Sequence, residues 1–81
     1  MNKVETIQEA IKLLRDKFKV SQSQLAKELG VSHTTVSLWE RGKSNVKPDN
    51  AYVLYKKFNV LVVSVFKDEK EVKGYEEWIN R

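Results

Sequence analysis

The sequence contains no cysteine and a single histidine among its 81 residues. It therefore has no disulfide, no thiol nucleophile and no cysteine-bound zinc, and one histidine provides no cluster for a histidine-based metal site. No apolar run approaches the 18 residues that a membrane-spanning helix needs. We expect neither a metal nor a cofactor, and we expect stability to come from packing alone.

The start of the chain lacks the apolar stretch of a secretory signal, and Glu5 and Glu9 are unlike the acid-poor sequence of a transit peptide. A length of 81 residues with 41% apolar content suits one small domain, without a separate catalytic or ligand-sensing domain. The sequence has neither a nucleophile–base pair nor a phosphate-binding glycine loop. These absences predict a cytoplasmic protein that is not an enzyme.

Basic side chains exceed acidic ones by four, and the excess is uneven along the chain. Residues 1–66 hold 11 basic and 6 acidic side chains, which gives +5, whereas residues 67–81 hold 4 and 5, which gives −1. The excess of basic side chains in residues 1–66 indicates a polyanionic partner, either nucleic acid or an acidic membrane surface.

A first helix is predicted between Thr6 and Phe18. Thr6 and Glu9 form a capping box at its start, in which each side chain satisfies an unpaired backbone N–H. One face follows the i, i+3, i+4 spacing of a half-buried helix, with Ile7, Ala10, Ile11, Leu14 and Phe18 as its apolar residues.

Two short helices joined by a tight turn are predicted in residues 21–42. Ser21 and Ser32 cap their starts, and Gly30 ends the first helix because glycine tolerates a positive φ. Polar residues lie on the outer face of the second helix. This arrangement is a helix-turn-helix, which can place its second helix in the major groove of DNA.

The same residues, SQSQLAKELGVSHTTVSLWERG, resemble the helix-turn-helix of the Cro/CI phage-repressor (Xre) family. The matching positions are Gln22, Leu25-Ala26, Gly30, Val36 and Trp39-Glu40-Arg41-Gly42. The resemblance covers residues 6–66 and implies an all-α fold, a compact five-helix lambda-repressor-like DNA-binding domain. Residues 1–66 would form this domain, and residues 67–81 would be a charged connector and an amphipathic tail.

Physical reasons for several of these residue types do not depend on the resemblance. Ala26 must be small because two helices cross tightly beside the turn. The expected core residues are Leu25, Leu29, Val31, Val36, Trp39 and Leu54. The resemblance adds a structural ion pair between Arg15 and Glu40.

The resemblance also implies which side chains meet DNA. His33, Thr34 and Ser37 would reach base edges, which suits imidazole and hydroxyl groups. Leu38 stands where relatives often carry a polar residue, so it either meets a thymine methyl group or covers the core. Phosphate or mixed contacts are expected from Gln22, Thr35, Arg41, Lys43, Ser44, Asn45 and Lys47. The alternative for the polar residues is an ordinary solvated surface.

A further helix is expected after Pro48-Asp49, where Asp49 can cap, and Asn59 can end it in a left-handed conformation. The following segment, Val60–Phe66, admits two predictions. Its β-branched residues favour a strand, which could pair with a second copy. The resemblance instead favours a fifth helix with Val62, Val65 and Phe66 inward.

The tail carries apolar residues at helical spacing, namely Tyr75, Trp78 and Ile79. They either pack back on the domain or form a contact with a second copy or another protein.

The function implied by the resemblance is sequence-specific regulation of transcription, with repression expected, by a protein that binds a double-stranded DNA operator as a homodimer. The alternative is an antitoxin or adaptor-type interaction module that contacts a protein partner through its tail. No membrane partner is expected.

Overall fold

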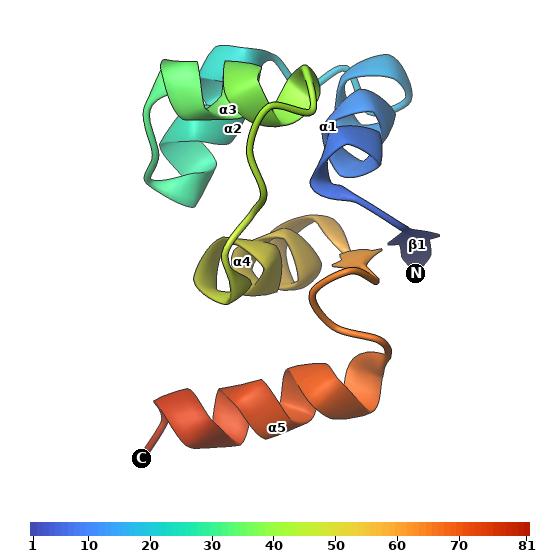
Figure 1. The fold of residues 1–81 in the computed structure, drawn as a ribbon, viewed down its shortest axis with the longest axis vertical. Helices are drawn as coiled ribbons and strands as arrows, with labels where there is room; N and C mark the ends of the chain where they lie inside the picture. Colours follow the sequence, from blue (N-terminus) through green and yellow to red (C-terminus); the bar gives the residue numbers. More distant parts are fainter.

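The computed structural model describes all residues from 1 to 81. The chain runs through β1 (Asn2–Val4), α1 (Ile7–Asp16), α2 (Gln22–Leu29), α3 (His33–Glu40), α4 (Pro48–Phe58), β2 (Val60–Val62) and α5 (Glu69–Ile79). The molecule measures 31 × 22 × 21 Å, and α2 and α3 lie at one end of its long axis, α5 at the other and α4 between them (Figure 1). The predicted fold class, a compact all-α domain with five helices, is confirmed, with one small sheet added. None of the helices has the length and apolar character required to cross a membrane.

The first three helices begin where the sequence places a capping hydroxyl. The side chains of Thr6, Ser21 and Ser32 each accept a hydrogen bond from the backbone N–H three residues later, at 3.3, 3.0 and 3.1 Å. Gly30 ends α2 at φ +66° and Asn59 ends α4 at φ +58°, both in the left-handed conformation. The capping signals of the sequence therefore predicted these helix ends correctly.

The start of α4 differs in one detail from the expectation. Pro48 is its first residue, and the preceding Lys47 is the N-cap without a side-chain hydrogen bond. Asp49 lies inside the first turn and accepts the N–H of Asn50 at 2.9 Å, so it does not cap the helix. Its negative charge still lies at the positive end of the helix dipole.

The first helix is shorter than predicted. It ends at Asp16, and Lys19 adopts a left-handed conformation at φ +57°. Phe18 is consequently 47% exposed and does not extend the buried stripe. The Val20 N–H donates to the carbonyl of Leu14 at 3.0 Å and so closes this end of the helix.

The segment Val60–Phe66 is not the helix that the resemblance favoured. Residues Val60–Val62 form β2, which pairs in parallel with β1 so that Asn2 lies opposite Val60. All three residues of β2 are completely buried. A strand suits the β-branched side chains of Val60 and Val62, and the first residues of the chain supply its partner. After the strand comes a turn, in which Phe66 is buried and Val65 only partly buried.

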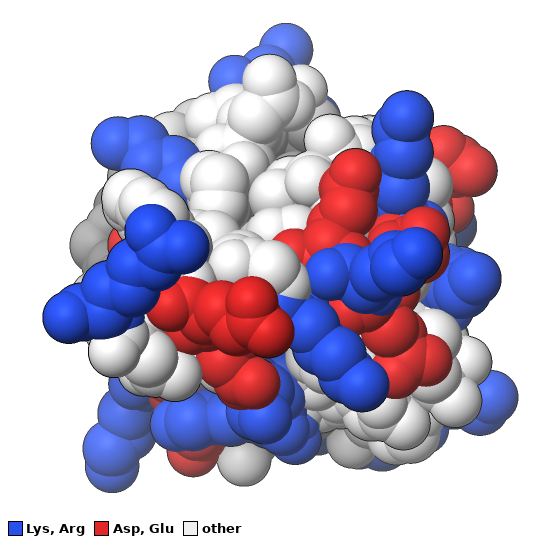
Figure 2. Space-filling view, turned by 90° about the horizontal axis from the view of Figure 1, so that it is seen from below, with Lys and Arg blue, Asp and Glu red and all other residues white.

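The fifth helix lies further along the chain, at α5. Asp68 caps it by accepting the N–H of Glu71, and Glu71 in return accepts the N–H of Lys67. Most of residues 67–81, expected to begin with a charged connector, therefore belong to a helix, and Val72 is 3% exposed within the core. Figure 2 shows acidic and basic side chains interspersed over the α5 end of the molecule.

Two hydrogen bonds attach α5 to α4. The Tyr52 hydroxyl donates to the Glu76 carboxylate, and the Tyr55 hydroxyl donates to Glu69 at 2.7 Å. The carboxylate of Glu76 raises the pKa of Tyr52 to about 12, chiefly through this hydrogen bond. The tyrosines therefore stay protonated and able to donate at neutral pH.

Of the three tail residues, only Tyr75 packs back on the domain. Its ring lies 5.4 Å, between centroids, from both Tyr52 and Phe66. Trp78 lies beside Tyr75 at 6.0 Å but is 66% exposed, and Ile79 is 42% exposed.

The core consists of 17 apolar residues and contains no buried polar side chain. Among the expected core residues, Leu25, Leu29, Val36, Trp39 and Leu54 are buried, and Val31 is partly buried. Val46 was not predicted, because it stands alone in a polar loop. It is 8% exposed and packs in the core, so it anchors the loop between α3 and α4.

Candidate nucleic-acid interface

The turn between α2 and α3 is closed by backbone hydrogen bonds around Gly30. The N–H of Val31 donates to the carbonyl of Ala26 at 3.0 Å while Gly30 holds its positive φ. Ala26 is 7% exposed at this junction. A larger side chain at Ala26 would need space that the two helices already fill.

The helix α3 divides into a buried face and an outer face. Val36 and Trp39 are 0% and 2% exposed and hold the helix on the core. By helical periodicity the opposite face carries His33, Thr34, Ser37, Leu38 and Arg41. The first two and Arg41 are exposed, whereas Ser37 and Leu38 are partly exposed. All four residues expected to touch bases therefore share one accessible face.

Thr35 lies away from this outer face. Its hydroxyl is 3.0 Å from the hydroxyl of Ser32, and its backbone N–H donates to the same oxygen. Thr35 therefore takes part in the cap at the start of α3.

The loop after α3 brings its polar residues to the surface. Lys43, Asn45 and Lys47 are exposed, and Ser44 is partly exposed. The Lys43 N–H donates to the carbonyl of Leu38 at 2.8 Å, which fixes where the loop leaves the helix. Two cations and two polar side chains thus lie close to the C-terminal end of α3.

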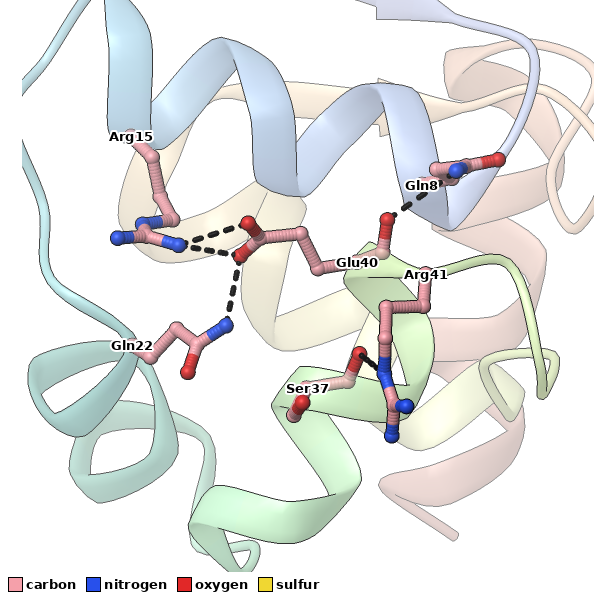
Figure 3. Close-up of polar contacts among 6 residues, drawn as sticks. All are labelled: Gln8, Arg15, Gln22, Ser37, Glu40 and Arg41. Carbon is pink, nitrogen blue, oxygen red and sulfur yellow. Dashed lines mark hydrogen bonds and ion pairs between the residues drawn. The ribbon is translucent and has the colours of Figure 1, made fainter.

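A polar network connects α1, α2 and α3 at the C-terminal end of α3 (Figure 3). Arg15 Nη1 donates to both carboxylate oxygens of Glu40 at 2.7 Å. The Gln22 side-chain amide donates to one of these oxygens at 2.9 Å. Glu40 therefore holds the first residue of α2 in a fixed relation to the end of α3.

Gln8 and Gly42 belong to the same region, and of these two residues Gln8 was not predicted. The Gln8 amide donates to the backbone carbonyl of Glu40 at 3.1 Å. A Cβ at Gly42 would lie 2.8 Å from Oε1 of Gln8, and Gly42 has a φ of +69°. Close approach and a left-handed backbone both explain glycine there. The sequence signals only the glycine, because the contact with Gln8 depends on how α1 packs.

The Arg15–Glu40 pair is partly exposed, with 38% and 31% of the side-chain surfaces accessible. The hydrogen bond from Arg15, followed by that from Gln22, holds the pKa of the Glu40 carboxyl below its usual value of 4.5. The hydrogen bond to Glu40 likewise raises the pKa of Arg15. The network is thus ionised and intact at neutral pH.

Acid should weaken this network. Because the folded-state pKa of Glu40 is lowered, its contribution to stability is present above pH 4.5 and is lost as the pH falls through the folded-state value. We expect Glu40→Gln to lower the melting temperature at pH 7 by roughly 5 °C or less, since solvent screens the pair. This difference from wild type should shrink below pH 4.5.

Thermal denaturation followed by circular dichroism between pH 3 and pH 7 would test this expectation. Glu77→Gln is the matched control, because it removes the same charge from an exposed position on α5. If the Glu40→Gln difference were constant across this range, the assigned role of the Glu40 carboxylate would be wrong.

A protein-family model described as helix-turn-helix matches residues 11–62, from within α1 to the end of β2. The chain belongs to the Cro/CI-type helix-turn-helix family. The match covers most of the chain and leaves β1 and all of α5 outside it. The family is one of DNA-binding transcription regulators.

The Cro/CI-type chain has three significant relatives among curated proteins. An uncharacterized HTH-type transcriptional regulator of Archaeoglobus fulgidus is 38% identical over 63 residues, which cover 76% of this chain and 89% of the relative. A second regulator of that organism is 34% identical over 65 residues, covering 79% and 93%. The HTH-type transcriptional regulator DicA of Escherichia coli is 45% identical over 51 residues, covering 63% of this chain and 38% of DicA. No solved structure matches the chain significantly.

Proposed function

We propose that this chain represses transcription by binding a specific double-stranded DNA operator with α3 in the major groove. The accessible polar face of α3, presented by two buried anchors on the opposite face, is the observation that carries this proposal. A helix held in this way can enter the groove without moving relative to the core. Residues 1–66 act as the DNA-binding domain, and residues 67–81 are an extension of it.

Base recognition is assigned to the outer face of α3. His33 and Thr34 offer hydrogen-bonding groups at the start of the helix, and Ser37 follows one turn later. Leu38 offers its methyl groups to a thymine. These four residues give the protein its preference for one DNA sequence over another.

Phosphate contacts flank this reading face. Gln22 lies at the start of α2, where backbone N–H groups and the helix dipole also favour an anion. One amide hydrogen of Gln22 is used by Glu40, so its second hydrogen is the one proposed for a phosphate. Phosphate or mixed contacts are further assigned to Thr35, Arg41, Lys43, Ser44, Asn45 and Lys47.

The operator complex is proposed to contain two chains related by a two-fold axis. Each half-site would then lie about one helical turn, roughly 34 Å, from the other. A second chain doubles the number of bases that are read.

Selection of bound duplexes from a random DNA library at near-physiological salt would test this function. We expect an enriched inverted repeat, and mass photometry of the complex should show two chains on the winning duplex. Affinity should fall by roughly a hundredfold to a thousandfold between 50 and 200 mM salt if each chain makes about five phosphate contacts. Weak, salt-sensitive binding without enrichment would contradict the proposal.

A further inference from the structure

The loop between α1 and α2, residues 17–21, contains a lysine whose backbone conformation suits another residue type better. Lys19 has a φ of +57°, and the only other residue apart from glycine with a positive φ is Asn59. Asparagine tolerates the left-handed region because its short side chain can hydrogen-bond to the nearby backbone, whereas a lysine has no such compensation. Glycine would adopt this conformation without a steric penalty. A lysine at this position therefore requires a reason other than folding.

The side chain of Lys19 makes no contact within the chain that would explain it. It is exposed, and none of the three ion pairs of the protein includes it. Asp16, the nearest acid in the sequence, forms no ion pair with it, and the first turn of α2 carries no acidic residue. Lys17 differs, because its ammonium lies 5.9 Å from the centre of the Phe18 ring. Lys19 thus presents an unpaired positive charge to solvent.

Both ends of this loop are fixed to the end of α3. Arg15, four residues before Lys19, and Gln22, three residues after it, bind the same carboxylate of Glu40. Figure 1 shows that the loop passes at the end of the molecule that carries α2 and α3, away from α5. Lys19 is therefore held next to the proposed DNA interface, close to the residue of α2 to which a phosphate is assigned.

The cations assigned to phosphates so far all come from one segment, residues 41–47. Figure 3 shows Gln22 and the loop between α1 and α2 on one side of the Glu40 carboxylate, and Arg41 on the other. A helix in the major groove has a phosphate backbone on each side, because both strands border the groove. On the α2 side the assigned contact, Gln22, is neutral. Lys19 is the unpaired cation on that side.

We propose that Lys19 binds a phosphate of the DNA backbone on the α2 side of the groove, next to the phosphate assigned to Gln22. This contact rests on the proposed function, and it places a positive charge against the second strand that borders the groove. The four-carbon stem of lysine lets the ammonium reach along the backbone. A phosphate contact carries no sequence information, so it raises the affinity for every duplex alike. The strained backbone at Lys19 is thus kept for binding and lowers the stability of the free chain.

Lys19→Gly tests both parts of this inference in one chain. Glycine relieves the backbone, so the melting temperature should rise by about 5 °C. The same change removes the ammonium, so affinity for operator and scrambled duplexes alike should fall about fivefold to tenfold at about 0.1 M salt. The slope of log affinity against log salt should fall by about one. Circular dichroism during heating and fluorescence anisotropy at several salt concentrations would measure these changes.

Three further variants separate the local charge from the backbone and from the net charge. Lys19→Arg keeps a cation, so it should retain the affinity and the salt slope of wild type. Lys19→Asn keeps a residue that tolerates a positive φ, and it should bind DNA as weakly as Lys19→Gly. Lys70→Ala removes one positive charge from an exposed position on α5, at the other end of the molecule, so it should bind nearly as tightly as wild type.

The results distinguish failure of this contact from failure of the proposed function. If wild type prefers its selected duplex and Lys19→Gly binds with unchanged affinity and slope, the contact is wrong and the proposed function stands. If wild type binds DNA without any preference and Lys19→Gly lowers the slope, the proposed function fails and the contact stands. An equal loss for Lys70→Ala would show that only net charge matters, and a Lys19→Gly chain that melts below wild type would show that the fold needs the lysine. Either result would overturn the inference.

Discussion

Replacing His33 and Thr34 together by alanine is expected to remove most of the preference for the operator over random DNA. A direct base contact contributes about 1–3 kcal/mol of discrimination, so loss of two should lower operator affinity on the order of a hundredfold or more. Both side chains are exposed, and the Ser32 cap of α3 stays in place, so the fold should be unaffected. Fluorescence anisotropy with the selected duplex and with a scrambled duplex would measure the two affinities.

Lys43→Ala provides the matched control for this experiment. A phosphate contact is indifferent to sequence, so this variant should weaken binding to both duplexes alike and lower the slope of log affinity against log salt by about one. Equal losses on both duplexes for the His33 and Thr34 variant would show that these residues do not read bases.

The second large effect is expected from Trp39→Ala. The side chain is 2% exposed and anchors α3 to the core, and loss of a buried tryptophan costs about 3–5 kcal/mol. A domain of this size has a total stability of about 5–15 kcal/mol, so the melting temperature should fall by tens of degrees. Thermal denaturation followed by circular dichroism would measure the shift.

Trp78→Ala is the same substitution at a position that is 66% exposed. Because the indole is mostly in contact with water, this change should alter the melting temperature by only a few degrees. If the two tryptophan variants melted at similar temperatures, the assignment of Trp39 as the anchor of α3 would be incorrect.

The features that the sequence predicted well depend on residues close together in the chain. Capping needs only a hydroxyl and a backbone N–H three residues away, and the left-handed helix ends need only Gly30 or Asn59. The buried face of α3 follows from the spacing of Val36 and Trp39. Periodicity and local conformational preference are enough for all of these features.

The errors arose where distant segments decide the conformation. The β-branched residues of β2 favoured a strand, but its partner, Asn2–Val4, lies far away in the sequence and carries no pattern that identifies it. Phe18 has helical spacing, yet α1 ends before it without a glycine or proline to mark the stop. Gln8 likewise reaches Glu40 only because α1 packs across the end of α3.

The small parallel sheet also sets the order in which the chain can complete its fold during synthesis. Helix α3 packs on both α1 and α2 within residues 7–40, but Asn2 cannot pair until Val60 has emerged from the ribosome. Closing so long a loop is slow because its entropic cost precedes the gain from pairing. The nascent helix-turn-helix therefore exists for a time with the residues of β1 unpaired, and an extension joined to the N-terminus would act on this last step.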